Sequence, residues 1–149
     1  MPTTPDPADF PTRLRRAVGR LSRRLRQTHA GAVLTPSQYE VLATLVVRGP
    51  LRHGDLAALE GLNPTMLSRI LGKLETAGLA ARVADVDDRR VIHVDATADG
   101  RELVARIRRE RADALRSALE GLPDDQLAAL EAALPGLEYL AERLKDRSP

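Results

Sequence analysis

The chain has 149 residues, of which 43% are hydrophobic and 2% aromatic, with 23 basic residues against 21 acidic ones and no cysteine. This length allows one domain with a sizeable core, and the scarcity of aromatic residues requires an aliphatic core, which favours helix packed on helix. The composition excludes disulfides and zinc–thiolate sites, disfavours aromatic platforms for single-stranded nucleic acid, and contains no apolar run long enough to span a bilayer.

The N-terminal region begins with residues 1–11, which are rich in proline, threonine and aspartate and lack the apolar core of a signal peptide. We expect a flexible arm here and a cytoplasmic protein. Thr12 can cap a helix that runs to about residue 30. Seven arginines crowd this helix beside an apolar stripe, and they either face phosphate or pair with acids elsewhere in a dimer: Arg13, Arg15, Arg16, Arg20, Arg23, Arg24 and Arg26.

The second helix begins with a clear signal, since Thr35 can cap it and Pro36 suits its first turn. Its apolar residues include Tyr39, and Gly49 with Pro50 ends it. Leu51 is then expected to form a one-residue bridge to a small sheet.

Residues 52–78 read as a helix, a tight turn and a second helix. Asn63 can cap the second of these helices, Pro64 suits its first position, and Gly78 offers a left-handed stop. One face carries Leu67, Ile70, Leu71 and Leu74, and the opposite face carries Thr65, Ser68, Arg69 and Gly72, with Lys73 at its edge. Hydroxyls and a forked cation are the groups that reach base edges and phosphates. The pattern is that of a helix-turn-helix, although a helical hairpin without a DNA partner stays open.

Two short apolar segments, residues 79–84 and 91–94, flank a charged turn and predict a hairpin, or wing. An arginine at its tip suits the negative potential of a minor groove. The alternative is a solvated loop in which Arg89 or Arg90 pairs with Asp87 or Asp88.

The C-terminal part predicts a long helix over about residues 98–119, capped by Thr97, and a last helix whose leucines repeat at helical spacing. Pro135 should kink or break that last helix. Its apolar stripe exceeds what a small globule can cover, so we expect an obligate homodimer packed through the first and last helices. An intramolecular bundle is the alternative.

The expected fold is therefore mainly α with a small β-hairpin wing. A winged helix-turn-helix DNA-binding domain spans residues 31–97, and dimerisation helices come from both termini, residues 12–30 and 98–149.

This order of elements resembles the MarR family of bacterial regulators over roughly residues 12–144. The resemblance rests on residues 34–39, 56–57, 68–69, 74–75, 78–82 and, most specifically, 88–90. It implies that Asp88 holds the wing, that Arg90 enters the minor groove and that Arg89 faces phosphate. The family usually has a leucine where this chain has Ala96, and a larger polar residue where it has Gly72. The predicted DNA-binding residues are Asn63, Pro64, Thr65, Ser68, Arg69, Lys73, Asp88, Arg89 and Arg90.

The resemblance implies a homodimeric, sequence-specific regulator of double-stranded DNA, a repressor acting on a pseudo-palindromic operator. Family members often release DNA when a small, frequently aromatic acid binds. Arg82 could anchor its carboxylate, with Arg16, His29 and Tyr39 on the pocket wall. The alternatives are that Arg82 bridges to an acidic neighbour and that His29 caps a helix end.

An enzyme is not expected, and neither is a cofactor or a metal. The three histidines show no metal-ligand spacing, and the chain has no glycine-rich phosphate loop or nucleophile elbow. A winged-helix module that binds protein rather than DNA remains the second interpretation, favoured if the surface across Thr65, Arg69, Lys73 and Arg90 is neutral or acidic.

Overall fold

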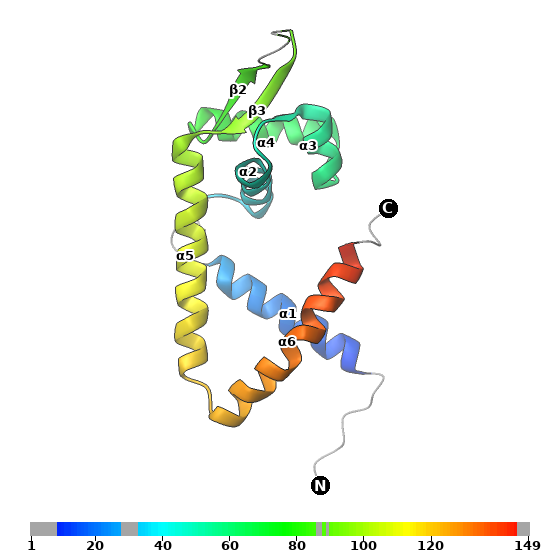
Figure 1. The fold of residues 1–149 in the computed structure, drawn as a ribbon, viewed down its shortest axis with the longest axis vertical. Coiled ribbons are helices and arrows are strands. Elements are labelled where there is room, and N and C mark those ends of the chain that lie inside the picture. The colour runs from blue at the N-terminus through cyan, green and yellow to red at the C-terminus, as the bar shows by residue number, and fades with distance from the viewer. Residues whose placement is uncertain (1–8, 28–32, 86–87, 89, 146–149) are drawn as a thin grey trace. The chain divides into compact units, whose positions relative to one another are not determined.

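The computed structural model describes residues 9–27, 33–85, 88 and 90–145, and the chain divides into two compact units, residues 1–112 and 113–149. The fold is mainly helical with a small antiparallel sheet, as predicted. Its elements are α1 (Phe10–Arg26), α2 (Pro36–Arg48), β1 (Leu51–Arg52), α3 (His53–Glu60), α4 (Pro64–Thr76), β2 (Ala80–Ala84), β3 (Ile92–Ala96), α5 (Ala98–Glu120) and α6 (Asp124–Lys145) (Figure 1).

The helices α2 and α4 begin where the sequence predicts. The side chain of Thr35 accepts a hydrogen bond from the backbone N–H of Gln38, and the side chain of Gln38 accepts one from the N–H of Thr35. The side-chain oxygen of Asn63 accepts from the N–H of Met66 at 2.8 Å. Each cap satisfies backbone donors that have no partner inside the helix, which fixes the helix start.

The start of α1 differs from the prediction, because the helix begins at Phe10 and Thr12 lies inside its first turn. Asp9 occupies the cap position without a side-chain hydrogen bond. Pro11 is tolerated because the first-turn N–H groups need no intrahelical partner. The arm predicted over residues 1–11 is therefore too long at its C-terminal end, because Phe10 and Pro11 belong to α1. Residues 1–8 of this arm lie outside the described residues. The helix ends at Arg26 rather than near residue 30.

The three strands form one antiparallel sheet in the order β1-β3-β2. Leu51 pairs with Val94, and the hairpin partners run from Ala80 with Ala96 to Ala84 with Ile92. β3 therefore lies further along the chain than predicted, and β1 has two residues rather than one. Pairing across the hairpin sets this register.

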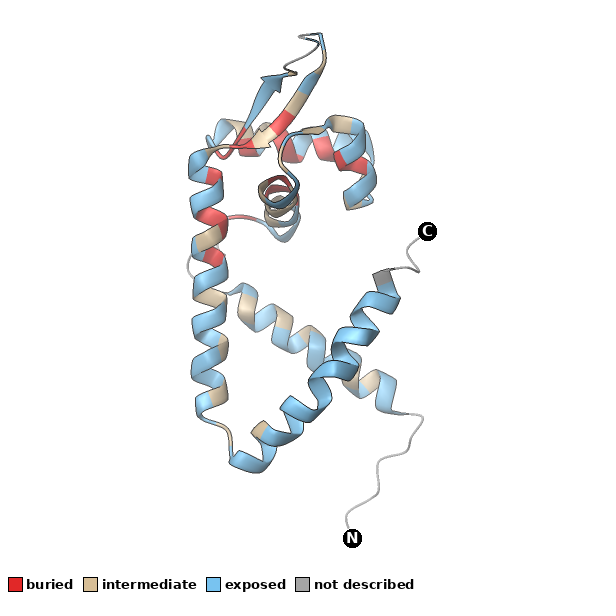
Figure 2. Ribbon diagram, viewed as in Figure 1, coloured by how far each residue is buried: buried red, intermediate tan, exposed pale blue. Residues whose placement is uncertain are grey.

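The core of the first unit lies within residues 34–107, where the buried side chains of the described residues are gathered (Figure 2). The leucine face of α4 is buried as predicted, with Leu67 and Leu74 fully inaccessible. The first half of α5 adds Leu103, Val104 and Ile107 to the same core. α2, α4 and the start of α5 thus form one packed body beneath the sheet.

The start of α5 is fixed against the end of α4. The hydroxyl of Thr97 donates to the carbonyl of Gly78 at 2.6 Å and accepts from the N–H of Gly100 at 3.1 Å, which confirms the predicted cap. A Cβ at Gly100 would clash with the backbone carbonyl of Leu79. Only glycine allows the backbone of α5 to approach the backbone of Leu79 so closely. The start of α5 is therefore fixed to the segment that joins α4 to β2.

The helix α6 in the second unit is continuous across Pro135, so the helix does not break there, and a kink at Pro135 stays a prediction. Proline removes one hydrogen bond from a helix interior. The remaining backbone hydrogen bonds of this 22-residue helix are sufficient to keep it helical on both sides of Pro135. Most of its leucines are exposed, at 37–58% of their surface: Leu130, Leu134, Leu137, Leu140 and Leu144. None of the helices in the described part of the chain has the length and apolarity needed to cross a membrane.

Candidate nucleic-acid interface

The outer face of α4 carries the side chains that the sequence predicts there. Thr65, Ser68, Arg69 and Lys73 are exposed, and Gly72 is half-buried. Successive residues of a helix are rotated by about 100°, so these positions lie opposite the buried leucines. The face therefore presents two hydroxyls and two cations to solvent. That these groups contact DNA stays a prediction.

The turn between α3 and α4 holds the two helices in a fixed relation. Gly61 adopts the left-handed conformation with φ of 62°, and the N–H of Leu62 donates to the carbonyl of Ala57 at 3.0 Å. Leu56 and Ala57 of α3 are buried in the same core as α4. A short helix, a glycine turn and a second helix with an exposed polar face form a helix-turn-helix.

A side-chain hydrogen bond that the sequence analysis missed also joins the two helices. The Nε2 atom of His53, the first residue of α3, lies 3.0 Å from the hydroxyl oxygen of Ser68 on α4. The residues are 15 positions apart, so no local pattern in the sequence relates them. The only available signal was the position of a histidine at the opening of the first motif helix.

The turn of the wing is organised by Asp88. Its carboxylate accepts from the backbone N–H of Arg90 at 3.0 Å and from the Nε of Arg90 at 3.3 Å. Its own N–H donates to the side chain of Asp85 at 3.1 Å. The side chain of Arg90 is 93% exposed, so it is available to a partner.

Asn63 and Pro64 form the capped start of α4, and Arg89 lies outside the described residues.

Close to its turn, the hairpin carries a second histidine that the sequence analysis did not assign. His93 on β3 places Nδ1 at 3.5 Å from the carboxylate of Asp85. His93 also pairs across the sheet with Arg52 of β1. The pairing of His93 with Arg52 joins the hairpin to β1, the strand that leads into α3.

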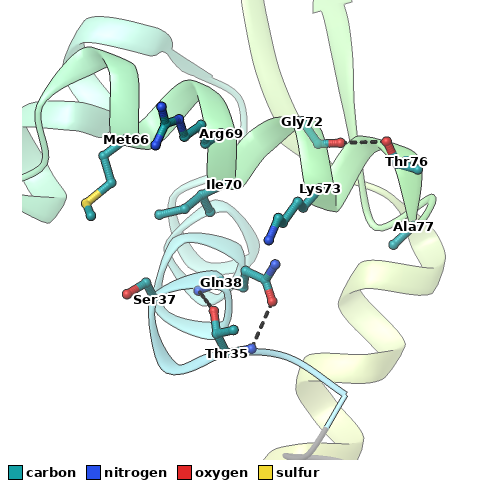
Figure 3. Close-up of a pocket in the computed structure, with 10 residues that line it drawn as sticks. All are labelled: Thr35, Ser37, Gln38, Met66, Arg69, Ile70, Gly72, Lys73, Thr76 and Ala77. Carbon is teal, nitrogen blue, oxygen red and sulfur yellow. Dashed lines mark hydrogen bonds between the residues drawn. The ribbon is translucent and has the colours of Figure 1, made fainter.

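A groove of about 670 Å³ runs between the start of α2 and the side of α4 (Figure 3). In Figure 3 the side chain of Lys73 points from α4 toward Gln38 of α2. The groove combines hydroxyls, an amide and two cations with an apolar floor. Its lining residues are Thr35, Ser37, Gln38, Met66, Arg69, Ile70, Gly72, Lys73, Thr76 and Ala77. The groove borders the exposed face of α4, with which it shares Arg69 and Lys73.

The charges around this surface favour an anionic partner. Arg69, Lys73 and Arg90 are exposed, whereas two acids nearby are engaged with arginines. Glu75 pairs with Arg82 at 3.0 Å, and Asp88 pairs with Arg90. The exposed positions of α4 carry the hydroxyls of Thr65, Ser68 and Thr76, the cations Arg69 and Lys73, and the apolar Met66, while the acid Glu75 at the edge of this face is half-buried. A cationic face of this kind favours DNA over a protein partner.

The candidate ligand residues are found in separate surroundings. Arg82 lies on β2 and forms the ion pair with Glu75, as the structural alternative held. Tyr39 on α2 is covered by the guanidinium of Arg111, 4.2 Å from the ring centroid. The Nε of Arg111 is buried without a hydrogen-bond partner among the described residues. Arg16 is exposed on α1, and His29 lies outside the described residues. Within those residues, no cluster of three or more histidines or acids could hold a metal.

Comparison with known proteins places this arrangement in a family. The model of the MarR family matches residues 34–92. An uncharacterised HTH-type transcriptional regulator of Mycobacterium bovis is 32% identical over 133 residues, 89% of this chain and 90% of its own length. The HTH-type transcriptional repressor MdtR of Bacillus subtilis is 34% identical over 67 residues, 45% of this chain and 43% of its own length.

Solved structures agree with this result. A protein of Pseudomonas aeruginosa described as a transcriptional regulator has a TM-score of 0.80 at 32% identity, covering 93% of this chain and 99% of its own. BpsR of Bordetella bronchiseptica, whose DNA binding is regulated by 6-hydroxynicotinic acid, has a TM-score of 0.67 at 26% identity, covering 93% of this chain and 94% of its own.

Proposed function

The chain belongs to the MarR family of transcriptional regulators, and on this basis we propose that it is a homodimeric repressor that binds a pseudo-palindromic operator and releases it when a small acid binds. The family consists of DNA-binding regulators, so the chain is a regulator and not an enzyme. A regulator that acts on bacterial DNA works in the cytoplasm, which is where we place it.

The observation that carries the proposal is the set of exposed hydroxyls and cations on α4, Thr65, Ser68, Arg69 and Lys73, together with the exposed Arg90 of the wing. In a two-fold dimer, the two α4 helices would enter successive major grooves about one helical turn apart. The two wings would reach the flanking minor grooves, whose negative potential attracts arginine. Thr65, Ser68 and Arg69 would then face base edges, and Lys73 would face phosphate.

The homodimer is supported by apolar surface that each unit leaves uncovered. α1 buries none of its residues, and Phe10, Val18 and Leu21 are 62%, 52% and 52% exposed. In α6, five leucines are exposed. Exposed apolar side chains that gather into one patch mark an interaction site on a protein. A second copy of the chain supplies the same surfaces and closes the assembly.

The acid-binding part of the proposal rests on resemblance, and BpsR offers a relative whose DNA binding responds to an aromatic acid. Arg82 could serve as the anchor only if the acid displaced Glu75 from it. Tyr39, Arg16 and His29 remain proposed wall residues. Calorimetry with salicylate tests this part: absence of heat, together with unchanged affinity for DNA, would remove its support.

The test of DNA binding is a salt titration with a duplex selected from a random library by the protein itself. A dimer that neutralises about 6 to 10 phosphates loses a factor of about 10³ to 10⁵ in affinity between 50 and 200 mM salt. A flat response would instead favour the protein-interaction module. Sedimentation of the same sample reports whether the binding species is a dimer.

A further inference from the structure

The hydrogen bond between His53 and Ser68 has a position that makes it relevant to DNA. Ser68 lies on the exposed face of α4, where the proposed function puts the operator. His53 lies at the first residue of α3 and is half-buried. The imidazole Nε2 and the hydroxyl oxygen are 3.0 Å apart, a normal hydrogen-bond length.

The local structure explains why His53 reaches across to α4. α3 starts without a side-chain cap, because Arg52 in the cap position makes no such hydrogen bond. The backbones of the two helices are fixed by buried contacts that include Leu56 and Leu67. The imidazole of His53 therefore extends from α3, whose backbone is fixed, and forms a hydrogen bond with the Ser68 side chain of α4.

The chemistry of a serine hydroxyl gives this contact a consequence. The group has one donor hydrogen and two acceptor lone pairs, and it rotates freely when it has no partner. If Nε2 donates to Ser68, the hydroxyl hydrogen is left to point outward, toward acceptors such as guanine O6 or N7. If Nε2 accepts, the hydroxyl oxygen is left to accept, for example from adenine N6 or cytosine N4. In both cases the imidazole fixes the direction of the hydroxyl before DNA arrives.

We propose that His53 is a positioning residue for sequence reading, which fixes the orientation of the Ser68 hydroxyl on the recognition helix. The inference rests on the proposed function, because it gives His53 a role only if Ser68 faces a base. It adds a residue outside the recognition helix to the determinants of operator choice. Ordering the hydroxyl in advance removes part of the entropic cost of binding.

The decisive experiment is a double-mutant cycle of His53→Ala and Ser68→Ala. It is measured on the duplex selected by the wild-type protein and on a scrambled duplex of equal length. Each single variant should weaken binding to the selected duplex about five- to tenfold, the range of one hydrogen bond to a base. Binding to the scrambled duplex should change little. The double variant should be no weaker than either single one, because both changes remove the same interaction.

A matched pair of substitutions separates positioning from a structural role. The amide of glutamine reaches about as far from the backbone as Nε2, whereas the amide of asparagine falls short. His53→Gln should therefore restore discrimination between the two duplexes, and His53→Asn should not. Melting temperatures of all variants should stay near that of the wild type, because the two side chains lie at or near the surface.

Two results would overturn the inference. Additive losses in the cycle would show that His53 and Ser68 act independently. An equal loss on selected and scrambled duplexes would assign His53 to phosphate binding or to folding. Both presuppose that the wild-type protein binds DNA, so they are distinct from the failure of the proposed function, in which the wild type selects no duplex at all.

Discussion

The apolar stripe of α4 and the apolar stripe of α6 have nearly the same spacing in the sequence and opposite surroundings in the structure. On α4, Leu67 and Leu74 are fully buried beneath α2 and the sheet. On α6, Leu130 and Leu134 are about half exposed (Figure 2). Helical periodicity thus predicts which face of a helix is apolar. It does not predict whether that face packs against the same chain or against another one. The leucine face of α4 is covered within its own chain, whereas the apolar face of α6 would be covered by the second copy in the homodimer that we propose.

The largest expected effect comes from placing charge on the uncovered face. The double substitution Leu134→Glu and Leu137→Glu should prevent dimerisation, because four carboxylates, two from each protomer, would be buried in the proposed interface. Sedimentation should report a monomer, and affinity for the selected duplex should fall by about 10² to 10⁴, the gain that linking two half-site contacts provides. Val47→Glu, at an exposed apolar position of α2, is the control. A dimer that survives the double change would place the interface elsewhere.

The winged unit should instead fail through its internal packing. Gly100→Ala forces a methyl group against the carbonyl of Leu79, and overpacking of this kind costs about 1–3 kcal/mol. Denaturant unfolding at one fixed protein concentration should show a lower midpoint with an unchanged slope. Unaltered stability would mean that α5 can shift away from the sheet without cost.

The wing should respond in affinity rather than stability. Asp88→Ala removes the acceptor that holds the backbone of Arg90, so the wing should lose its preset shape, and operator affinity should fall about three- to tenfold. The salt dependence should keep its slope, because no phosphate contact is lost. Arg90→Ala is the comparison: if it contacts phosphate while entering the groove, the slope should fall by about one. Identical slopes for both variants would contradict a phosphate contact by Arg90.

The smallest effect is expected at Gly72 on α4. A Cβ there would meet no atom within 4 Å, so Gly72→Ala should stabilise the helix by up to about 1 kcal/mol. This change is also the matched control for Gly100→Ala, since both add one methyl group to a helical glycine. A loss of operator affinity without a loss of stability would show that DNA approaches closely at this position.

Local signals in the sequence were sufficient for much of the fold. Thr35 and Asn63 mark the starts of α2 and α4, because each side chain accepts a hydrogen bond from a backbone N–H three residues later. The exposed residues of α4 follow from the rotation between successive residues of a helix. The start of α1 was misplaced because Pro11 is compatible with a first turn as well as with an arm. The register of β3 was misplaced because pairing with β2 decides it.

The contacts that complete the candidate site could not be predicted in the same way. His53 and Ser68 meet only after the turn has folded, and Arg82 finds Glu75 across the junction of α4 and β2. Such pairs depend on the placement of two elements, which no pattern within either element contains.

Among the described elements, α5 has a property of its own, because it begins at the clasp of Thr97 and Gly100 and continues past residue 112 into the second unit. Its 23 residues make a rod of about 35 Å. A rod that is fixed at one end acts as a lever: a tilt of about 10° displaces its other end by about 6 Å, more than one helical pitch. A small change of angle at the N-terminal end of α5 would therefore become a large displacement at the end of this helix that lies in the second unit.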